Sequence, residues 1–160
     1  MRALWVVALL AGGPAWGQGT EARAPDASGV VAEIFAEQID TDSDGKLSRM
    51  ELLVFGVQVF ASMDTDSDGD VSKAEWRDWE FGARDIAVFR EKADSYDTAF
   101  GIVFDIFDRS QDGFISSDEF ERAVLISTEN ADLDGDSALS VQEYVSNFII
   151  SIAIRNVYER

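Results

Sequence analysis

The sequence predicts an all-α fold built from repeated helix–loop–helix units. A twelve-residue motif, Asp-x-[Asp/Ser]-x-Asp-[Gly/Ser]-x-apolar-Ser-x-x-Glu, begins at Asp40, Asp64, Asp108 and Asp132. The segments between the motifs carry apolar residues at helical spacing. Two of these segments have the length of one helix and a third has the length of two. The motifs are therefore expected to be loops that helices connect.

Residues 1–17 are predicted to be a signal peptide. Arg2 gives a positive start, Ala3 to Ala11 form an apolar run, and Ala15-Trp16-Gly17 offers a cleavage site before Gln18. The alternatives are a core helix or a membrane anchor, but the run is shorter than the ~20 residues that span a bilayer. We therefore expect an exported protein, periplasmic or secreted after cleavage near Gly17, with no membrane span in the mature chain.

The mature chain is expected to form one domain. Residues 18–28 are polar and contain Pro25, so they are predicted to be a flexible leader. Residues 29–160 hold all four motifs and have the length of an ordinary domain. Cysteine is absent, so no disulfide can stabilise the exported chain. Bound metal can take that role.

The charge of the chain is strongly negative and concentrated in the motifs. Without Arg2 the mature chain has 12 basic and 31 acidic residues, a net charge of −19. This balance argues against nucleic acid or an anionic membrane as a partner. Fifteen of the acidic side chains lie at candidate ligand positions of the motifs. The charge is therefore largely that of the binding sites.

Each motif places oxygen atoms where a twelve-residue loop needs them to surround a hard cation. Positions 1, 3, 5, 9 and 12 supply side-chain oxygens, and position 7 supplies its backbone carbonyl. Position 9 contributes directly or through water, and Glu at position 12 contributes both oxygens. Glycine at position 6 permits the positive φ of a sharp turn. Loops of this composition favour Ca²⁺, with Mg²⁺ as a competitor.

Loops 1 and 2 match the pattern at every position. The candidate ligands of loop 1 are Asp40, Asp42, Asp44, Lys46, Ser48 and Glu51, and those of loop 2 are Asp64, Asp66, Asp68, Asp70, Ser72 and Glu75. Lys46 and Asp70 contribute only their carbonyl oxygens. These loops are predicted to be the strongest sites.

Loops 3 and 4 depart from the pattern at one position each. The candidate ligands are Asp108, Ser110, Asp112, Phe114, Ser116 and Glu119 in loop 3, and Asp132, Asp134, Asp136, Ala138, Ser140 and Glu143 in loop 4. Ser110 replaces a carboxylate at position 3, and Ser137 replaces the turn glycine. A positive φ at Ser137 costs about 1 kcal/mol. A frame from Asn130 would place Gly135 at the turn but would end on Val141, so the Asp132 frame is preferred.

The Ser-x-x-Glu half of each motif has a second interpretation as a helix capping box. Both interpretations can hold, because position 9 lies at the start of the following helix. A cap does not account for the acidic residues at two-residue spacing or for the apolar residue at position 8. We therefore favour four metal loops over four acidic turns.

With these four motifs, the Asp40–Glu143 stretch resembles the exported EF-hand calcium-binding proteins of the calmodulin-like superfamily. The resemblance covers most of the mature chain. It implies helix–loop–helix units, Ca²⁺ as the ligand, and loops joined in pairs by short β-bridges at position 8. Those positions are Leu47, Val71, Ile115 and Leu139. It thus makes the expected fold an EF-hand array with β-bridges between paired loops.

The spacing of the loops predicts which of them pair. Leu52 to Met63 separate the first two loops and Phe120 to Ala131 separate the last two, so one helix must serve both loops in each case. Such a helix holds its loops ~20 Å apart. We therefore expect loops 2 and 3 to form a central pair and loops 1 and 4 an outer pair. In the rival arrangement, the outer loops pair between two chains.

The remaining helices follow from the apolar pattern. Between loops 2 and 3 we expect an exiting helix to about Lys92 and an entering helix from about Ser95. The helix between loops 3 and 4 is expected to end early, because the segment Ser127-Thr-Glu-Asn130 has low helix propensity. The segment from Val141 to Tyr158 is predicted to form one apolar terminal helix. It either packs in the core or binds a protein partner or a second copy through residues 141–158.

Calcium binding, rather than catalysis, is the predicted function. The chain lacks His and Cys, so the commonest general base and the thiol nucleophile are missing. Sensors of the family expose a Met-rich groove, whereas the mature chain has only Met50 and Met63. This favours a Ca²⁺ buffer or calcium-stabilised module with up to four ions. The alternative is a Ca²⁺-dependent sensor that recognises a partner through its C-terminal helix.

Overall fold

The computed structural model describes residues 27–79 and 81–158. The predicted signal peptide, residues 1–17, lies outside them, as does most of the predicted leader. The first helix begins at Ala27, so the last two residues assigned to the leader are helical. In the described ranges, no helix combines the length and apolar character needed to cross a membrane.

The described chain consists of helices with four three-residue strands, which confirms the predicted all-α class. The helices are α1 (Ala27–Ile39), α2 (Arg49–Met63), α3 (Lys73–Asp78), α4 (Ala83–Phe89), α5 (Ala93–Phe107), α6 (Ser117–Ala131), α7 (Val141–Asn147) and α8 (Ile149–Tyr158). The strands are β1 (Lys46–Ser48), β2 (Asp70–Ser72), β3 (Phe114–Ser116) and β4 (Ala138–Ser140). Each strand covers positions 7 to 9 of one loop.

The loops pair as the spacing predicts. β1 pairs with β4 and β2 pairs with β3, both antiparallel, so loops 1 and 4 form the outer pair and loops 2 and 3 the inner pair. Leu47 lies opposite Leu139, and Val71 lies opposite Ile115. All four of these position-8 side chains are fully buried. Both pairs form within one chain, without the second chain of the rival arrangement.

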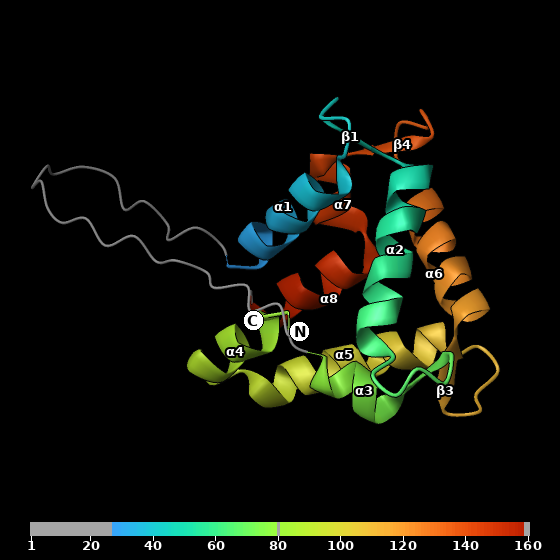
Figure 1. The fold of residues 1–160 in the computed structure, drawn as a ribbon. Coiled ribbons are helices and arrows are strands. Elements are labelled where there is room, and N and C mark those ends of the chain that lie inside the picture. Colours follow the sequence, from blue (N-terminus) through green and yellow to red (C-terminus); the bar gives the residue numbers. More distant parts are fainter. Residues whose placement is uncertain (1–26, 80, 159–160) are drawn as a thin grey trace, which may run out of the picture.

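The two shared helices set the distance between the pairs. α2 and α6 each have 15 residues, about 22 Å at the α-helical rise. They pack against one another, with the outer pair at one end and the inner pair at the other (Figure 1). Each helix therefore carries one loop into each pair.

The fold is an internal repeat. Loop 3 begins 68 residues after loop 1, and loop 4 begins 68 residues after loop 2. The same offset relates α1 to α5, α2 to α6, α3 to α7 and α4 to α8. Each loop pair therefore joins one loop from the first half to the non-equivalent loop of the second half. Loops 2 and 4 occupy equivalent places in the two pairs.

The core lies between the helices of the two halves and is rich in aromatic side chains. The Trp76 ring contacts those of Phe100, Phe104 and Phe107, and Phe107 in turn contacts Phe120. Phe104 and Phe107 are almost fully buried. These contacts join the exit of loop 2 to both helices that flank loop 3.

The prediction that α6 ends early is wrong. α6 continues through Ser127–Asn130 to Ala131, and the N–H of Asp132 donates to the carbonyl of Thr128 at 3.0 Å. Ser127 and Thr128 are buried, and the Thr128 hydroxyl donates to the carbonyl of Val124 at 2.9 Å. Burial and this internal hydrogen bond outweigh the low helix propensity of the segment.

The exit from loop 2 is two helices, where the sequence predicted one. α3 ends at Asp78, and the backbone of Trp79, the next residue, is extended (φ −66°, ψ 114°). α4 starts after Gly82, which has a φ of 90°. Apolar spacing cannot detect this break, because it continues on both sides of it. The next helix, α5, starts at Ala93, two residues before the predicted Ser95.

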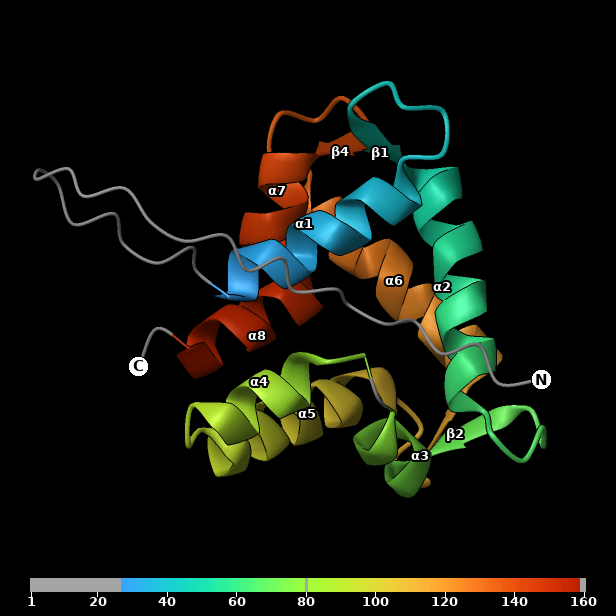
Figure 2. The same cartoon turned by 60° about the vertical axis from the view of Figure 1, so that its left-hand side comes forward.

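The terminal segment is also divided. α7 and α8 are separated at Phe148, whose φ and ψ are −70° and 137°. No proline or glycine marks this break, and the Phe148 side chain is buried against Tyr144. The bend lets α8 pack against α1 and α5 (Figure 2). Its Ile154 and Val157 are buried, so this segment contributes mainly to the core.

Gly56 of α2 is buried and faces α6. A Cβ added to it would lie 3.5 Å from both Phe120 and Val124, which is ordinary van der Waals contact.

Gly56→Ala should raise the free energy of unfolding by about 0.5–1 kcal/mol, because alanine is the better helix former. Gly56→Leu should lower it by about 1–3 kcal/mol through overpacking. Denaturant unfolding of both variants in Ca²⁺ tests this; equal loss in both would contradict it.

Candidate metal centres

All four loops end in a capping box, as the second interpretation of the motif required. The Ser hydroxyl at position 9 accepts from the Glu N–H at position 12, and the Glu carboxylate accepts from the Ser N–H. The pairs are Ser48/Glu51, Ser72/Glu75, Ser116/Glu119 and Ser140/Glu143. Each pair fixes its glutamate at the helix N-terminus, so the cap also positions a carboxylate beside the loop.

In loops 1 and 2 the same glutamate reaches back to the start of the loop. Glu51 Oε1 accepts from the N–H and hydroxyl of Thr41 at 2.8 and 2.9 Å. Glu75 Oε1 accepts from the same two groups of Thr65, both at 2.9 Å. Position 2 thus helps to close the loop, which the sequence motif did not indicate. With the N–H and hydroxyl of the position-9 serine on the other oxygen, each of these carboxylates accepts four hydrogen bonds, so a bound cation would replace some of them.

Hydrogen bonds keep these glutamates ionised. The backbone N–H of Ser48, followed by the Ser48 hydroxyl and Thr41, lowers the pKa of Glu51 to about 2. The equivalent bonds lower the pKa values of Glu75 and Glu119 to about 2 and also lower the pKa of Glu143. The charged form of all four carboxylates is therefore stabilised, and they stay ionised to a lower pH than an ordinary glutamate.

The aspartate at position 1 organises the turn. It accepts from the N–H of position 6: Gly45 donates to Asp40 at 3.0 Å, and Gly69 donates to Asp64 at 3.1 Å. In loop 4 the N–H of Ser137 makes this bond to Asp132 at 3.0 Å. The shared bond supports the frame that starts at Asp132 over the frame that starts at Asn130.

Loops 1 and 2 bring three carboxylates together. Asp40, Asp42 and Glu51 each offer an oxygen, and these oxygens lie within 4.8 Å of one another. The same holds for Asp64, Asp66 and Glu75. They occupy positions 1, 3 and 12, from both ends of the loop. A convergent set of hard oxygens fits Ca²⁺ or Mg²⁺ better than a transition metal.

Loop 3 is arranged differently. Asp108 Oδ1 accepts from the N–H of Gln111 at 2.7 Å, and Asp108 Oδ2 accepts from the N–H of Gly113 at 3.0 Å. Ser110 donates its N–H to Glu119 at 2.8 Å. Among the described residues, the acidic side chains of this loop do not form a convergent group of three. The missing acid at position 3 accounts for this difference.

Loop 4 gathers its carboxylates at one end. Asp132, Asp134 and Asp136, at positions 1, 3 and 5, form a convergent group that does not include Glu143. Asp136 also forms an ion pair with Lys46 of loop 1. This contact raises the pKa of Lys46 and lowers that of Asp136. No pattern in the sequence indicates this contact, because the motif assigns Lys46 only a carbonyl ligand.

Ser137 adopts the strained conformation that the sequence predicts. Its φ is 74°, and Gly135, two residues earlier, has the same value. In each of the other loops, positions 4 and 6 also have positive φ, with glycine at position 6. Loop 4 thus has its glycine at position 4, where the other loops tolerate Ser or Gln. The displaced glycine leaves a serine at position 6.

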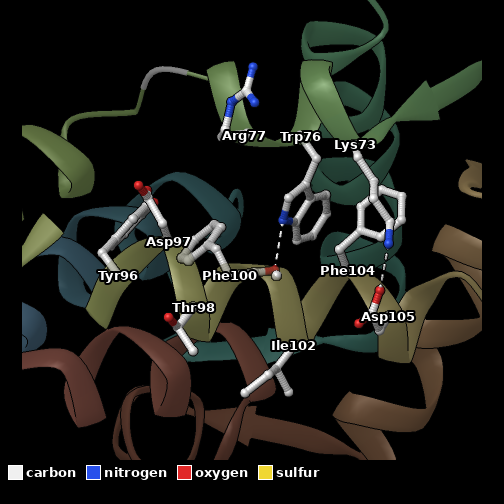
Figure 3. Close-up of a pocket in the computed structure, with 11 residues that line it drawn as sticks. Lys73, Trp76, Arg77, Tyr96, Asp97, Thr98, Phe100, Ile102, Phe104 and Asp105 are labelled. Atoms are coloured by element: carbon white, nitrogen blue, oxygen red, sulfur yellow. Dashed lines mark hydrogen bonds and ion pairs between the residues drawn. The ribbon is translucent and has the colours of Figure 1, made fainter. Parts of the chain in front are cut away.

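A pocket beside loop 2 is lined by Trp76, the residue that follows the last candidate ligand of that loop. It lies between α3 and α5 (Figure 3). The Trp76 indole N–H donates to the carbonyl of Phe100 at 3.0 Å, and Lys73 pairs with Asp105 at 3.0 Å. Trp76 follows Glu75 directly and is buried. Trp76 is therefore a well-packed indole next to the last candidate ligand of loop 2.

Relieving the strain at Ser137 should stabilise loop 4. Ser137→Gly should raise the free energy of unfolding by about 1 kcal/mol, since glycine adopts a positive φ freely. The matched change Gly113→Ser, at a φ of 92° in loop 3, should lower it by a similar amount. Thermal unfolding in Ca²⁺ and in chelator measures both. A less stable Ser137→Gly chain would contradict this account of the turn.

Comparison with known proteins supports the first three loops directly. The family described as EF hand matches residues 37–55, 57–78 and 100–125, which contain loops 1, 2 and 3. No curated protein matches the chain. The family match does not include loop 4, and the groups of three convergent carboxylates do not include one in loop 3. The two criteria differ because the match reads the sequence pattern and the geometry requires three convergent acids.

Loops 1 and 2 satisfy both criteria. The EF-hand matches imply calcium binding, and this family is typically non-enzymatic. The chain thus carries EF-hand motifs at its first three loops, and its fold is an EF-hand helix–loop–helix array.

Proposed function

We propose that this protein is an exported calcium-binding protein that holds Ca²⁺ at all four loops and serves as a buffer or calcium-stabilised module. The observation that carries the proposal is the convergence of carboxylates from positions 1, 3 and 12 in loops 1 and 2. These acids come from both ends of each loop. An ion bound there would tie the entering helix to the exiting helix.

The proposed ligands are the six residues of each loop identified from the sequence. In loop 3, Asp108, Asp112 and Glu119 supply the charge, and Ser110 supplies a neutral oxygen. In loop 4, the N–H of Ser137 on Asp132 supports the same frame as in the other loops. Mg²⁺ is the expected competitor, because it also prefers oxygen ligands.

Calcium should stabilise the fold through charge. Each loop contains three or four carboxylates at its side-chain ligand positions, and these repel one another without a cation. The chain has no cysteine to form a disulfide. Binding to the folded state alone adds ~2.7 kcal/mol per site when Ca²⁺ exceeds the dissociation constant a hundredfold. The paired loops join distant parts of the chain, so this energy acts on the whole domain.

Removing calcium should therefore lower the melting temperature strongly. We expect circular dichroism melts of residues 18–160 in millimolar Ca²⁺ to show a higher midpoint and more helix than melts in chelator. Calorimetric titration with Mg²⁺ as competitor should give up to four sites. Identical melts in both conditions would contradict the proposal.

Two matched variants assign the signal to a loop. Trp76 and Trp79 are the only tryptophans of residues 18–160, and Trp76 follows the last ligand of loop 2. Glu75→Gln should remove the calcium-dependent change in tryptophan fluorescence, because the closing carboxylate is lost. Glu51→Gln, the same change in loop 1, should leave most of it. Equal effects of the two variants would show that the fluorescence does not report loop 2.

Export is the untested part of the proposal and rests on the sequence of residues 1–17. Expression of the full chain in a bacterial host should yield a periplasmic or secreted product that starts at Gln18. Val7→Asp, which interrupts the apolar run, should keep Met1-containing protein in the cytoplasm. N-terminal mass spectrometry of each fraction measures this. Retention of the unaltered chain with an intact N-terminus would contradict it.

A second candidate function is calcium-dependent recognition of a protein partner. A shallow groove between α5 and α8 contains Ile102 and Ile106, both more than half exposed, next to Ile149 and Ile152. Such apolar surface can serve recognition. An apolar dye separates the two functions: increased binding with Ca²⁺ supports a sensor, and unchanged or reduced binding supports a buffer.

A further inference from the structure

The ion pair between Lys46 and Asp136 places a cation of one loop on a ligand of another. Lys46 is position 7 of loop 1, and Asp136 is position 5 of loop 4. We propose that Lys46 is a tethered cation that lowers the Ca²⁺ affinity of loop 4 below that of its equivalent, loop 2. This inference rests on the proposed binding of calcium by these loops and deepens it.

The register of the β-bridge accounts for the contact. Lys46 lies opposite Ser140, position 9 of loop 4, so its side chain extends along the edge of that loop. In the inner pair the equivalent residue, Phe114, lies opposite Ser72 of loop 2 in the same way. Phe114 carries no charge. The two equivalent loops therefore face different position-7 side chains.

The same geometry places the other two position-7 residues. Asp70 lies opposite Ser116 of loop 3, and Ala138 lies opposite Ser48 of loop 1. Asp70 thus adds a negative charge beside the loop that lacks one acid. Lys46 removes a negative charge from a loop that has four acids. Each bridge lets one loop alter the charge around its neighbour.

The expected effect follows from Coulomb's law. An exposed ion pair contributes little to folding, and both side chains here are partly exposed. Calcium binding is affected more directly, because the ion needs the oxygen that Lys46 occupies. A unit charge about 4 Å from a carboxylate in water changes affinity roughly fivefold. Loop 4 should bind about fivefold more tightly without the Lys46 ammonium.

Amide NMR can follow the four loops separately. The N–H of position 6 donates to the aspartate at position 1 in every loop. These reporters are Gly45, Gly69, Gly113 and Ser137, one for each loop. Because an ion on the aspartate polarises this bond, each amide shift should report the occupancy of its own loop during a Ca²⁺ titration of the full chain.

The first test is Lys46→Met, which keeps the length of the side chain and removes its charge. The Ser137 midpoint should fall about fivefold in calcium concentration, while those of Gly69 and Gly113 change less than twofold. Lys46→Arg, which retains the charge, should keep the original midpoint. In chelator, Lys46→Met should slightly lower the melting temperature, because the loop 4 carboxylates lose their counter-ion. A purely structural role for Lys46 would not raise affinity at one loop.

The second test introduces a lysine at the equivalent position of the inner loop pair. Phe114 is 45% exposed, so the surface tolerates a change there. Phe114→Lys should raise the Gly69 midpoint of loop 2 about fivefold, because its ammonium can reach Asp68, the equivalent of Asp136. Phe114→Met is the uncharged control and should leave that midpoint unchanged.

The outcomes separate this inference from the proposed function. If the amides of Gly45 and Gly69 respond to calcium but Lys46→Met leaves the Ser137 response unchanged, the inference is overturned and calcium binding stands. The same holds if all midpoints move together. If no reporter amide of the unaltered chain responds to calcium, both the proposed function and the inference fail.

Discussion

A rigid fifteen-residue helix joins loop 1 to loop 2 and another joins loop 3 to loop 4, and this spacing determines which loops can meet. Loops about 22 Å apart on one helix cannot share a β-bridge. Each must find its partner on the other helix. The packing of α2 against α6 provides this, because it aligns loop 1 with loop 4 and loop 2 with loop 3. The bridges, the core and the arrangement of the ligands all follow from that single alignment.

The two halves of the chain therefore depend on one another. Neither half contains a complete loop pair, so each position-8 side chain is buried only when both halves are folded. The repeat also makes the differences between loops informative. Loops 2 and 4 have the same place in the fold and four acids each at the side-chain ligand positions, yet loop 4 has a serine at its turn and its Asp136 is paired with Lys46. Charge and backbone strain, rather than fold, distinguish the proposed sites.

The fold and most of the proposed ligand set could be predicted from the sequence because both depend on spacing. Twelve residues between loops 1 and 2 admit one helix, and this alone indicates the pairing that β1 and β4 show. The breaks at Trp79 and Phe148 could not be predicted, because tertiary packing decides where the apolar segments bend. Packing also extends α6 over Ser127–Asn130, against its local propensity. The Lys46–Asp136 contact depends on the register of two strands that are 90 residues apart, which no local pattern encodes.

The pairing of the four loops of one chain into an outer and an inner pair determines the rest of the fold. It is tested most directly by NMR contacts between backbone amide protons in Ca²⁺-loaded protein, recorded on a mixture of labelled and unlabelled chains. We expect contacts within one chain across the two bridges, from Leu47 to Leu139 and from Val71 to Ile115. A contact between Leu47 and Val71, or a Leu47–Leu139 contact found only between different chains, would contradict it.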